Sequence, residues 1–456
     1  MYNCKNSVLY LLDEKKIPMN PLQVLLVHPP IFDFTAYDFW LRPYGMMRAA
    51  AQIGNACRFT FFDFLTTAKK DVWGRGRFPE KIVARPEVLR DIPRRFRRFG
   101  RPRAEFQTLL RSKNFAAVLI QTGMTYWYPG VREVIEDVRT LQPGAKIVLG
   151  GVYATLCSEH ARKLGADLVI HGANLEPLQQ LLDVEPDQTV RRNSIFIPPV
   201  TSDVGVLKLS DGCPFHCTYC AAPMMWNGFA PRNLGECLED FHRLVASGAK
   251  DIAFYDDALL HRAGEVLLPF LDLTQAMTTT MSGENNSVRF HTPNALNARF
   301  MTSELARRMV KAGFASFFMG LESGAASWQA ATGGKVRREE FAAAVESLRT
   351  AGAQAIFAYI IAGHPDSETQ ELEEALRFAH RCGVRVILSE FSPLPGTPDG
   401  MKCAPWADLA EPLSHNKTAF ALRRLGPDYL NRIKELTRVL NSELSVGRKH
   451  EISGLG

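Results

Sequence analysis

The chain has 456 residues, a length that favours two or three domains of about 100–200 residues each. Hydrophobic residues make up 46% of the chain and charged residues 22%. This balance excludes an intrinsically disordered protein, which would have fewer apolar residues and a larger net charge. The apolar stretches at 23–27 and 355–362 are far shorter than the roughly 20 residues of a transmembrane helix, and residues 1–20 lack the order of a secretion signal. We therefore expect a cytoplasmic protein without a transmembrane segment.

Residues 21 to about 198 alternate between short apolar runs and helical patterns. The predicted strands are 23–28, 58–63, 116–121, 145–150 and 167–171, with an amphipathic helix at 131–141. Strands that alternate with helices predict a doubly wound parallel sheet, a Rossmann-like α/β fold. Such sheets bind ligands at the carboxyl ends of their strands, where this sequence has Pro29-Pro30, Thr122-Gly123 and Gly150-Gly151.

The net charge of +6 is concentrated in a basic segment between Lys69 and Lys113, where arginines are interleaved with aromatic residues. Such a segment can bind a nucleic acid or an anionic substrate. The alternative is an insertion that packs on its own domain, because a run of charge alone specifies little. We favour the packed insertion, over residues 66–113, and expect no nucleic-acid partner.

The segment 194–203, with paired prolines, predicts a linker, and strands and helices alternate again after it. The predicted strands are 205–210, 251–255, 288–291, 316–321, 354–361 and 384–391, and the predicted helices are 234–247, 303–312, 337–351 and 368–382. Six βα units predict an incomplete (β/α)6 barrel of the TIM type. Residues 414–446 show a helical pattern only and predict a helical tail.

Cys213, Cys217 and Cys220 lie within eight residues, directly after the first predicted barrel strand. The nine cysteines are odd in number and otherwise scattered, which is typical of a metal site in a reducing compartment. Three thiolates at this spacing can hold three irons of a 4Fe–4S cluster and leave the fourth iron open. An open iron can bind the amino and carboxylate groups of S-adenosylmethionine (SAM), and one electron then releases a 5′-deoxyadenosyl radical.

Structural zinc is the main alternative for this cysteine loop. Zinc normally has four closed ligands, and here Cys237 or His216 would have to supply the fourth. The sequence has no second cysteine pair, which favours the cluster. We interpret the remaining cysteines as structural: Cys4, Cys57, Cys157, Cys237, Cys382 and Cys403.

The motif Cys213-x-x-x-Cys217-x-x-Cys220, with Tyr219 before the last cysteine, resembles the signature of radical SAM enzymes. Residues 21–398 resemble those family members that have an amino-terminal domain of the cobalamin (B12)-binding type. The resemblance implies that Tyr219 lies near the adenine of SAM. It also implies four regions: an extension at 1–20, a cobalamin-binding-like domain at 21–195, a radical SAM barrel at 196–400 and a helical tail at 401–456.

Further barrel motifs are similar to elements by which that family binds SAM. Asp256-Asp257 stands where the family has a carboxylate that contacts the methionine amino group, as an ammonium-like donor in a dry site requires. The stretches His291-Thr-Pro-Asn294 and Gly320-Leu-Glu322 are expected to end the third and fourth strands and to face the ribose and methionine of SAM.

Two more stretches complete this comparison. Gly363-x-x-Asp366 is similar to the adenine-backing motif, with aspartate where glutamate is more usual, and residues 389–398 are expected beside the substrate.

Each of these motifs has a structural alternative when it is taken singly. Asp256 or Asp257 can cap a helix, Glu322 can pair with Arg337 or Arg338, and Gly363 can form a turn. Their shared position at strand carboxyl ends, where barrel active sites are built, favours the cofactor interpretation.

Short motifs of the amino-terminal half are similar to the cobalamin-binding half of the family. Thr122, Gly150 and Gly151 are expected to line the cobalamin crevice, because glycines let a ligand approach the backbone closely. The Asp-x-His-x-x-Gly motif, which supplies a cobalt ligand in some members, is absent. The alternative is a domain of this fold that has lost its cofactor or serves as a lid. His28 and His171 are candidates for polar contacts at the crevice, although a lone histidine is more often a scaffold residue.

These features predict a radical SAM enzyme, and our leading hypothesis is cobalamin-dependent methylation of an unactivated carbon. The expected cofactors are a 4Fe–4S cluster, SAM and cobalamin. The resemblance implies a small-molecule or lipid-like substrate and an external one-electron reductant such as flavodoxin or ferredoxin. Two alternatives stay open: radical rearrangement, cyclisation or other carbon–carbon chemistry without methyl transfer, and a cluster-bearing redox sensor that binds nucleic acid through the basic segment.

Overall fold

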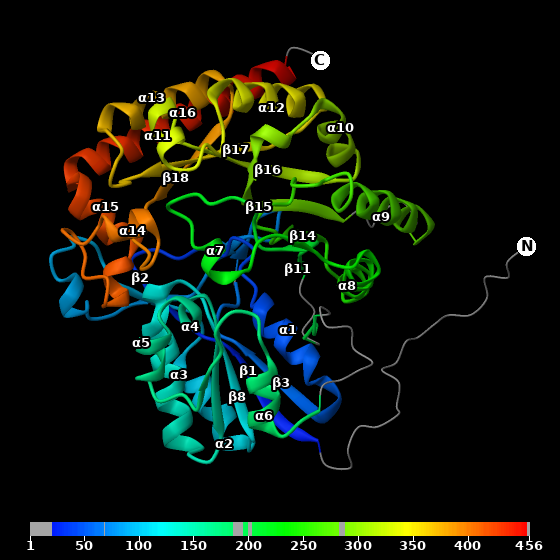
Figure 1. Ribbon diagram of the computed structural model, residues 1–456, viewed down its shortest axis with the longest axis vertical. Helices are drawn as coiled ribbons and strands as arrows, with labels where there is room; N and C mark the ends of the chain where they lie inside the picture. The colour runs from blue at the N-terminus through cyan, green and yellow to red at the C-terminus, as the bar shows by residue number, and fades with distance from the viewer. Residues whose placement is uncertain (1–20, 68, 186–194, 199–202, 282–287, 454–456) are drawn as a thin grey trace, which may run out of the picture.

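The computed structural model describes residues 21–67, 69–185, 195–198, 203–281 and 288–453. The expected extension 1–20, with Cys4, and part of the predicted linker lie outside these residues. Two α/β units are stacked in Figure 1, with the amino-terminal sheet in the lower half and a curved second sheet in the upper half. The expected fold class, a doubly wound parallel sheet followed by a partial barrel, is confirmed.

The lower sheet has five parallel strands in the order β10-β9-β8-β1-β3. Its strands are β1 (Leu22–His28), β3 (Cys57–Asp63), β8 (Ala117–Thr122), β9 (Lys146–Gly151) and β10 (Leu168–Val169). Its helices are α1 (Tyr44–Gln52), α3 (Tyr128–Leu141), α4 (Val152–Leu156), α5 (Ser158–Arg162) and α6 (Glu176–Leu182). Leu25 and Val27 pack in one hydrophobic core and Val24 and Leu26 in another, because successive strand residues point to opposite faces. The strand order reverses between β1 and β8, which is where sheets of this type bind ligands.

The basic segment packs partly on its own domain and partly on the barrel, where the rings of Trp73 and Phe357 meet with centroids 6.5 Å apart. It forms β4 (Lys69–Lys70), β5 (Gly76–Arg77), β6 (Glu80–Ile82), β7 (Arg97–Phe99) and helix α2 (Arg103–Ser112), and β7 pairs with β2 (Ile31–Asp33). Arg98 lies 2.7 Å from Glu133 and Arg103 lies 2.9 Å from Asp137, both acids on α3. These arginines therefore neutralise acids of the same domain, as expected for a packed insertion.

The upper sheet has six parallel strands in the order β11-β14-β15-β16-β17-β18. They are β11 (Val204–Leu207), β14 (Asp251–Phe254), β15 (Arg289–Asn297), β16 (Phe314–Glu322), β17 (Ile356–Ala362) and β18 (Arg385–Glu390). The helices of this half are α7 (Ala222–Met225), α8 (Leu234–Ala246), α9 (Leu267–Met281), α10 (Ser303–Lys311), α11 (Ala326–Ala331), α12 (Arg338–Thr350), α13 (Thr369–Arg381) and α14 (Pro398–Met401). A short ribbon, β12 (Ser210–Asp211) with β13 (Ala230–Pro231), brackets the cysteine loop.

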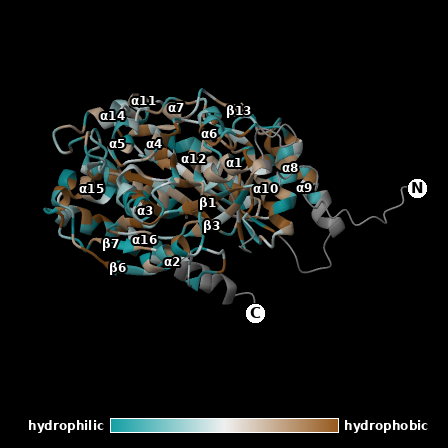
Figure 2. Ribbon diagram, turned by 90° about the horizontal axis from the view of Figure 1, so that it is seen from below, coloured by the Kyte–Doolittle hydropathy of each residue, from teal (hydrophilic) through white to brown (hydrophobic). Residues whose placement is uncertain are grey.

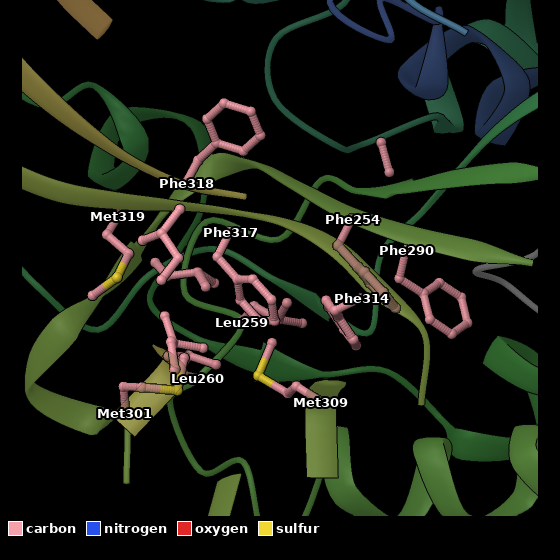
Figure 3. Packing of buried hydrophobic residues seen from close by; sticks show 14 of the residues in the cluster. Phe254, Leu259, Leu260, Phe290, Met301, Met309, Phe314, Phe317, Phe318 and Met319 are labelled. Carbon is pink, nitrogen blue, oxygen red and sulfur yellow. The ribbon is translucent and has the colours of Figure 1, made fainter. Parts of the chain in front are cut away.

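The two faces of β16 pack against different partners. In Figure 3, Phe317 and Met319 point toward the buried residues between sheet and helices, and Phe318 points the opposite way. On its own side, Phe318 meets Phe39, with ring centroids 5.0 Å apart. The amino-terminal domain therefore supplies part of the packing on the inner face of the barrel sheet.

His291 does not end the third barrel strand, as the sequence led us to expect. It lies near the start of β15, which continues to Asn297 after a register shift. Its two ring nitrogens contact Asp251 at 2.8 Å and Ser316 at 2.7 Å, and Trp40 stacks on the ring at 4.3 Å. His291 is a fully satisfied scaffold residue.

The carboxyl-terminal tail is helical, as expected, with α15 (Lys417–Leu425) and α16 (Pro427–Ser453). It joins the two halves: the Asn416 amide donates to Asp33 at 2.8 Å, and His415 Nδ1 lies 3.0 Å from the Thr125 hydroxyl. In the view of Figure 2, hydrophobic and hydrophilic residues alternate along the helices, as expected where one side of a helix packs on a core. Among the described residues, no helix is both long and apolar enough to cross a membrane.

Candidate active site

A cavity of about 450 Å³ lies at the carboxyl ends of the barrel strands, next to the cysteine loop. It brings together most of the barrel residues singled out from the sequence. Those that line it are Cys213, Cys217, Tyr219, Cys220, Asp257, Asn294 and Glu322, together with residues 389–392 and Leu394. Residues from four strand ends and one loop thus meet in a single space.

The entry to the cysteine loop packs closely against the segment that follows the loop, around Gly228. Gly212 has a φ of +73°, and a Cβ there would lie 2.0 Å from the Gly228 carbonyl oxygen, so the turn into the loop requires glycine. At the other end of the loop, the Cys220 sulfur accepts a hydrogen bond from the Ala222 N–H at 3.4 Å, at the start of α7. The loop therefore has a defined entry and exit around its three thiols.

The raised pKa values of the Cys213 and Cys220 thiols favour a role as metal ligands over a role as free thiolate nucleophiles. Burial raises the pKa of Cys213, and it raises that of Cys220 to about 11, so a bound metal is needed to remove these protons. In the described part of the chain, no three metal-ligating side chains are gathered for a single ion. Thiolates on three separate irons of a cluster need not meet at one point, as the ligands of a zinc ion must. Cys237, the zinc alternative, is buried against β11, with its thiol 3.7 Å from the Lys208 carbonyl oxygen.

Glu322 pairs with a lysine that sequence reasoning missed. Lys335 Nζ lies 2.6 Å from Glu322 Oε1, and both side chains line the cavity. Burial alone would lower the pKa of Lys335, but the charge of Glu322 and the hydrogen bond to it outweigh burial and raise that pKa. Lys335 is therefore a cation beside the cysteine loop. Arg338, which the structural alternative offered as a partner of Glu322, instead donates to the Gly324 carbonyl at 2.6 Å.

The backbone at Glu322 is strained in a way that aims its carboxylate. Glu322 has a φ of +61°, an uncommon value for a residue with a side chain, and β16 has a register shift between Gly320 and Glu322. A Cβ at Gly320 would lie 2.5 Å from Glu322 Oε1 and 2.6 Å from Lys335 Nζ. Glycine at position 320 thus leaves the space that the ion pair occupies.

The two neighbouring aspartates after β14 have different environments. Asp257 lines the cavity, with its carboxylate 3.4 Å from Lys208. Asp256 faces the other way and accepts hydrogen bonds from the Leu209 and Ser210 N–H groups and the Ser210 hydroxyl. Burial raises the pKa of Asp256 to about 6. The expected cofactor role of Asp256 is therefore replaced by a structural one, because adjacent residues project to opposite sides.

Asn294 lines the cavity and also fixes its wall, since its amide donates to the Tyr255 carbonyl at 2.9 Å. Asn297 is a second asparagine of this wall that sequence reasoning missed. Its amide nitrogen is buried without a hydrogen-bond partner among the described residues. No local pattern marks Asn297, because the register shift in β15 decides which side chains reach the cavity.

Gly363 is absent from the cavity wall, contrary to the sequence expectation. It has a φ of +84°, and a Cβ there would approach Ala421 of α15 at 3.4 Å. The positive φ therefore favours glycine here, and the tail helix packs beside it at ordinary contact distance. Asp366, the departure from the family motif, pairs with Lys402 at the surface, and Tyr359 and Ile361 are the residues of β17 that reach the cavity.

Tyr219 has the environment of a ring held in place. It stacks on Trp328 with centroids 5.6 Å apart, and its hydroxyl is buried without a hydrogen-bond partner among the described residues. Burial raises the pKa of Tyr219, so the phenol stays neutral.

At the carboxyl edge of the amino-terminal sheet, Thr122, Gly150 and Gly151 lie together, but part of their bonding is internal. The Thr122 hydroxyl donates to the Gly150 carbonyl and accepts from the Ala154 N–H, both at 3.0 Å. Gly151 has a φ of +114°, and a Cβ there would lie 2.2 Å from the Thr122 carbonyl oxygen. Thr122 and Gly151 thus shape the strand-to-helix turn. Of the two histidines near this edge, His28 pairs with Asp63 at 3.0 Å.

Gly150 and Gly172 leave open backbone at the same edge. A Cβ at Gly150 would meet only Ile170, at 3.9 Å, and a Cβ at Gly172 would lie 3.8 Å from the Met225 carbonyl oxygen of α7. Helix α4 also packs against α7, and both are found where the two halves meet in Figure 1. The ligand-binding edge of the lower sheet therefore faces the helix that follows the cysteine loop.

Comparisons with known proteins agree with these two halves. Residues 207–379 match the model of the radical SAM superfamily. An uncharacterized methyltransferase of Pyrococcus horikoshii is 23% identical over 198 residues, which cover 42% of this chain and 40% of the relative. A threonylcarbamoyladenosine tRNA methylthiotransferase of Thermotoga maritima is 25% identical over 285 residues, which cover 59% of this chain and 64% of the relative. The chain thus spans less than two thirds of the length of either relative.

Two solved structures share the fold over most of the chain. TsrM of Kitasatospora setae, a radical SAM methyltransferase, superposes with a TM-score of 0.63 at 15% identity and covers 84% of this chain and 76% of its own. OxsB, a cobalamin-dependent radical SAM enzyme, superposes with a TM-score of 0.55 at 12% identity and covers 92% of this chain and 61% of its own. The cysteine loop and the match over residues 207–379 thus identify a radical SAM domain in this chain, and the sheet packed beneath it shares its fold with the corresponding part of TsrM and OxsB.

Proposed function

We propose that this radical SAM enzyme methylates an unactivated carbon with the help of cobalamin and uses two molecules of SAM. One SAM supplies the methyl group by way of cobalamin, and the other supplies the radical. The observation that carries the proposal is the meeting of Gly172 and α4 with α7, the helix that begins two residues after Cys220. A cobalamin at the edge of the lower sheet and a cluster on the cysteine loop would then both face the same bound substrate.

Cys213, Cys217 and Cys220 would each hold one iron of the cluster. When bound, the cluster and SAM supply one-electron cleavage of a carbon–sulfur bond, which yields a 5′-deoxyadenosyl radical. The chain must hold the methionine part of SAM against the open iron. Lys335 keeps N–H donors beyond the one that Glu322 takes, and these suit a carboxylate, while Asp257 and Glu322 suit an ammonium group.

Apolar side chains form the rest of the cavity wall. They are Phe215, Ala222, Ala258, Pro293, Ala295, Tyr359, Ile361, Phe391 and Leu394. A wall of this kind excludes water, which strengthens the charge interactions inside and protects a radical from side reactions. Among residues 389–392, the Ser392 hydroxyl donates to the His415 carbonyl and Glu390 accepts from the Thr418 hydroxyl, both at 2.6 Å, so Ser389 is the polar side chain of this stretch that we assign to the substrate.

The amino-terminal edge fits a corrin in one respect: the backbone is uncovered at Gly150, where a Cβ would meet only Ile170. Such positions let the nucleotide part of a cofactor approach the chain closely. When bound, cobalamin supplies a carrier for the methyl group. The fold shared with cobalamin-dependent enzymes supports this assignment.

Anaerobic reconstitution tests the proposal. Protein supplied with iron, sulfide and hydroxocobalamin should keep a corrin spectrum through gel filtration. Gly150→Ala should lose the corrin, because the protein itself has room for this methyl group and only a close ligand would meet it; Gly144→Ala, whose Cβ meets nothing within 4 Å, is the matched control. Loss of all corrin from the wild-type protein would overturn the cobalamin assignment.

The radical half is tested separately. Cys217→Ala should abolish 5′-deoxyadenosine formation and reduce the cluster spectrum. With cobalamin present, S-adenosylhomocysteine should form alongside 5′-deoxyadenosine. 5′-Deoxyadenosine without S-adenosylhomocysteine would favour rearrangement chemistry over methyl transfer.

A further inference from the structure

Thr218 stands between two of the cluster cysteines and is held from three directions. Its N–H donates to the Thr332 carbonyl at 3.2 Å, and its carbonyl accepts from the Asp399 N–H at 3.1 Å. Its hydroxyl donates to Asp399 Oδ2. Asp399, on α14, therefore binds Thr218 through both backbone and side chain.

Asp399 is completely buried, so its carboxylate depends on the donors around it. Besides the Thr218 hydroxyl, it contacts His364 Nε2 at 2.9 Å and Lys402 Nζ at 2.8 Å. Donors from Thr218, His364 and Lys402 thus hold this carboxylate, and Asp399 is absent from the cavity wall. A carboxylate satisfied in this way has a fixed orientation.

The hydrogen bonds around His364 assign its proton. Nδ1 faces the Trp328 indole N–H at 3.1 Å and the Asp366 N–H at 3.2 Å, and both of these groups are donors. Nδ1 must then be the acceptor, and Nε2 carries the proton that is donated to Asp399. The bonds run in one direction, from Trp328 through His364 to Asp399.

Trp328 closes the arrangement, because its ring also stacks on Tyr219. Thr218 and Tyr219 are the two residues between Cys217 and Cys220. Thr218 is held by hydrogen bonds to Asp399. Tyr219 is held by the Trp328 ring, whose N–H donates to His364, and His364 in turn donates to Asp399. The directions of both cysteine side chains follow from the backbone of these two residues.

We propose that Asp399, with His364 and Trp328, is a positioning network that sets the conformation of the Cys217–Cys220 loop and thereby the orientation of the cluster. This proposal rests on the assignment of the cluster to that loop. None of the three residues lines the cavity, so they act through Thr218 and Tyr219. Groups of this kind, which orient metal ligands without touching the metal, typically change metal affinity by about 10- to 100-fold.

Asp399→Asn tests the proposal, because it removes the negative charge and leaves one acceptor oxygen, so its amide NH2 must face either Lys402 or the His364 and Thr218 donors. In protein without a cluster, we expect deuterium exchange of residues 213–221 to become about 10-fold faster. In reconstituted protein, we expect loss of iron to a chelator to become about 10- to 100-fold faster, and the electron paramagnetic resonance g values of the reduced cluster to shift.

Asp137→Asn is the matched control. Asp137 is also buried and accepts hydrogen bonds from Arg103 and Gln107, and it lies in α3, far from the cysteine loop in the sequence. It should leave loop exchange, iron retention and g values unchanged. Thr218→Val, which removes only the hydroxyl, should shift all three readouts in the direction of Asp399→Asn, and it replaces that variant if Asp399→Asn does not fold.

Unchanged loop exchange and unchanged g values in both variants would overturn the positioning role. Failure of the wild-type protein to bind iron would refute the cluster assignment instead. Because loop exchange is measured without a cluster, the two failures are distinguishable.

Discussion

Lys335 Nζ and Glu322 Oε1 lie 2.6 Å apart in the wall of the cavity, with the two side chains only 17% and 7% exposed. The pair joins the end of β16 to the turn after α11, and it places a cation beside the cysteine loop. An ion pair this buried is poor evidence for added stability, since desolvation offsets most of the attraction. Its position suggests a part in binding a zwitterion such as the methionine end of SAM.

Lys335→Met should weaken SAM binding about 10- to 100-fold, because a charge-assisted hydrogen bond contributes roughly 1.5–3 kcal/mol. The iron content should stay at the wild-type level. Anaerobic calorimetry on reconstituted protein measures the affinity. Arg432→Met, which removes the partner of Glu373 at the surface, is the control. Equal affinities for the Lys335 variant and the wild type would remove Lys335 from the SAM site.

Gly320→Ala should disturb the same pair without changing a charge. Its Cβ would lie within 2.6 Å of both Glu322 Oε1 and Lys335 Nζ, so the pair must separate or shift. We expect weaker SAM binding and a lower melting temperature. Gly264→Ala, at an exposed turn where a Cβ meets nothing within 4 Å, should change neither. If the Gly320 variant bound SAM as tightly as the wild type, displacement of the Glu322–Lys335 pair would not affect SAM affinity, which would contradict this prediction.

Asn416→Ala should destabilise the protein by about 2.5–4 kcal/mol. The residue caps α15 by accepting from the Ala419 N–H, and its amide donates to the buried carboxylate of Asp33. The lost cap costs about 1 kcal/mol and the lost bond to a charged group about 1.5–3 kcal/mol. Asn233→Ala removes only a cap, that of α8, and should cost about 1 kcal/mol. Chemical denaturation of both variants gives the comparison, and equal losses would mean that the Asp33 contact contributes nothing.

His415 should make the protein less stable in mild acid. Burial lowers the pKa of His415 below its ordinary value of 6.5, so the folded protein keeps it neutral while the unfolded chain protonates it. The unfolded state then binds more protons, and stability falls as the pH drops below about 6.5, by at most about 1.4 kcal/mol per pH unit. His415→Gln should lose less stability than the wild type between pH 7.5 and pH 5.5 in thermal melts. Parallel pH profiles for the two proteins would contradict this assignment.

The strands could be predicted from local pattern because their residues are buried on both faces. The apolar runs at 23–28 and 116–121 match β1 and β8 to within one residue, and six barrel strands occur where the alternation placed them. The third barrel strand was drawn too short, since β15 passes through Pro293 and a register shift before it ends. A proline normally indicates the end of a strand, and only the neighbouring strands show that this one continues.

Asp256 and Asp257 show why the site was predicted only in part. Both follow β14 in the sequence, and nothing local distinguishes them. The fold turns Asp256 to the N–H groups of Leu209 and Ser210 and leaves Asp257 in the cavity. Likewise, Gly363 was assigned to the cofactor, but the tail helix α15 occupies the space beside it.

The sequence by itself determined the cysteine loop, the two runs of alternating strands and helices, and therefore a radical SAM barrel behind a doubly wound domain. These features depend on residue spacing and periodicity over short segments, and such patterns are present in the sequence whatever tertiary contacts form. Tertiary structure alone decided that Lys335 meets Glu322, that Asp399 holds Thr218, and that the amino-terminal edge faces α7. Such contacts join residues from 13 to 181 positions apart, and their partners are chosen by packing and by the need of each buried polar group for a hydrogen bond.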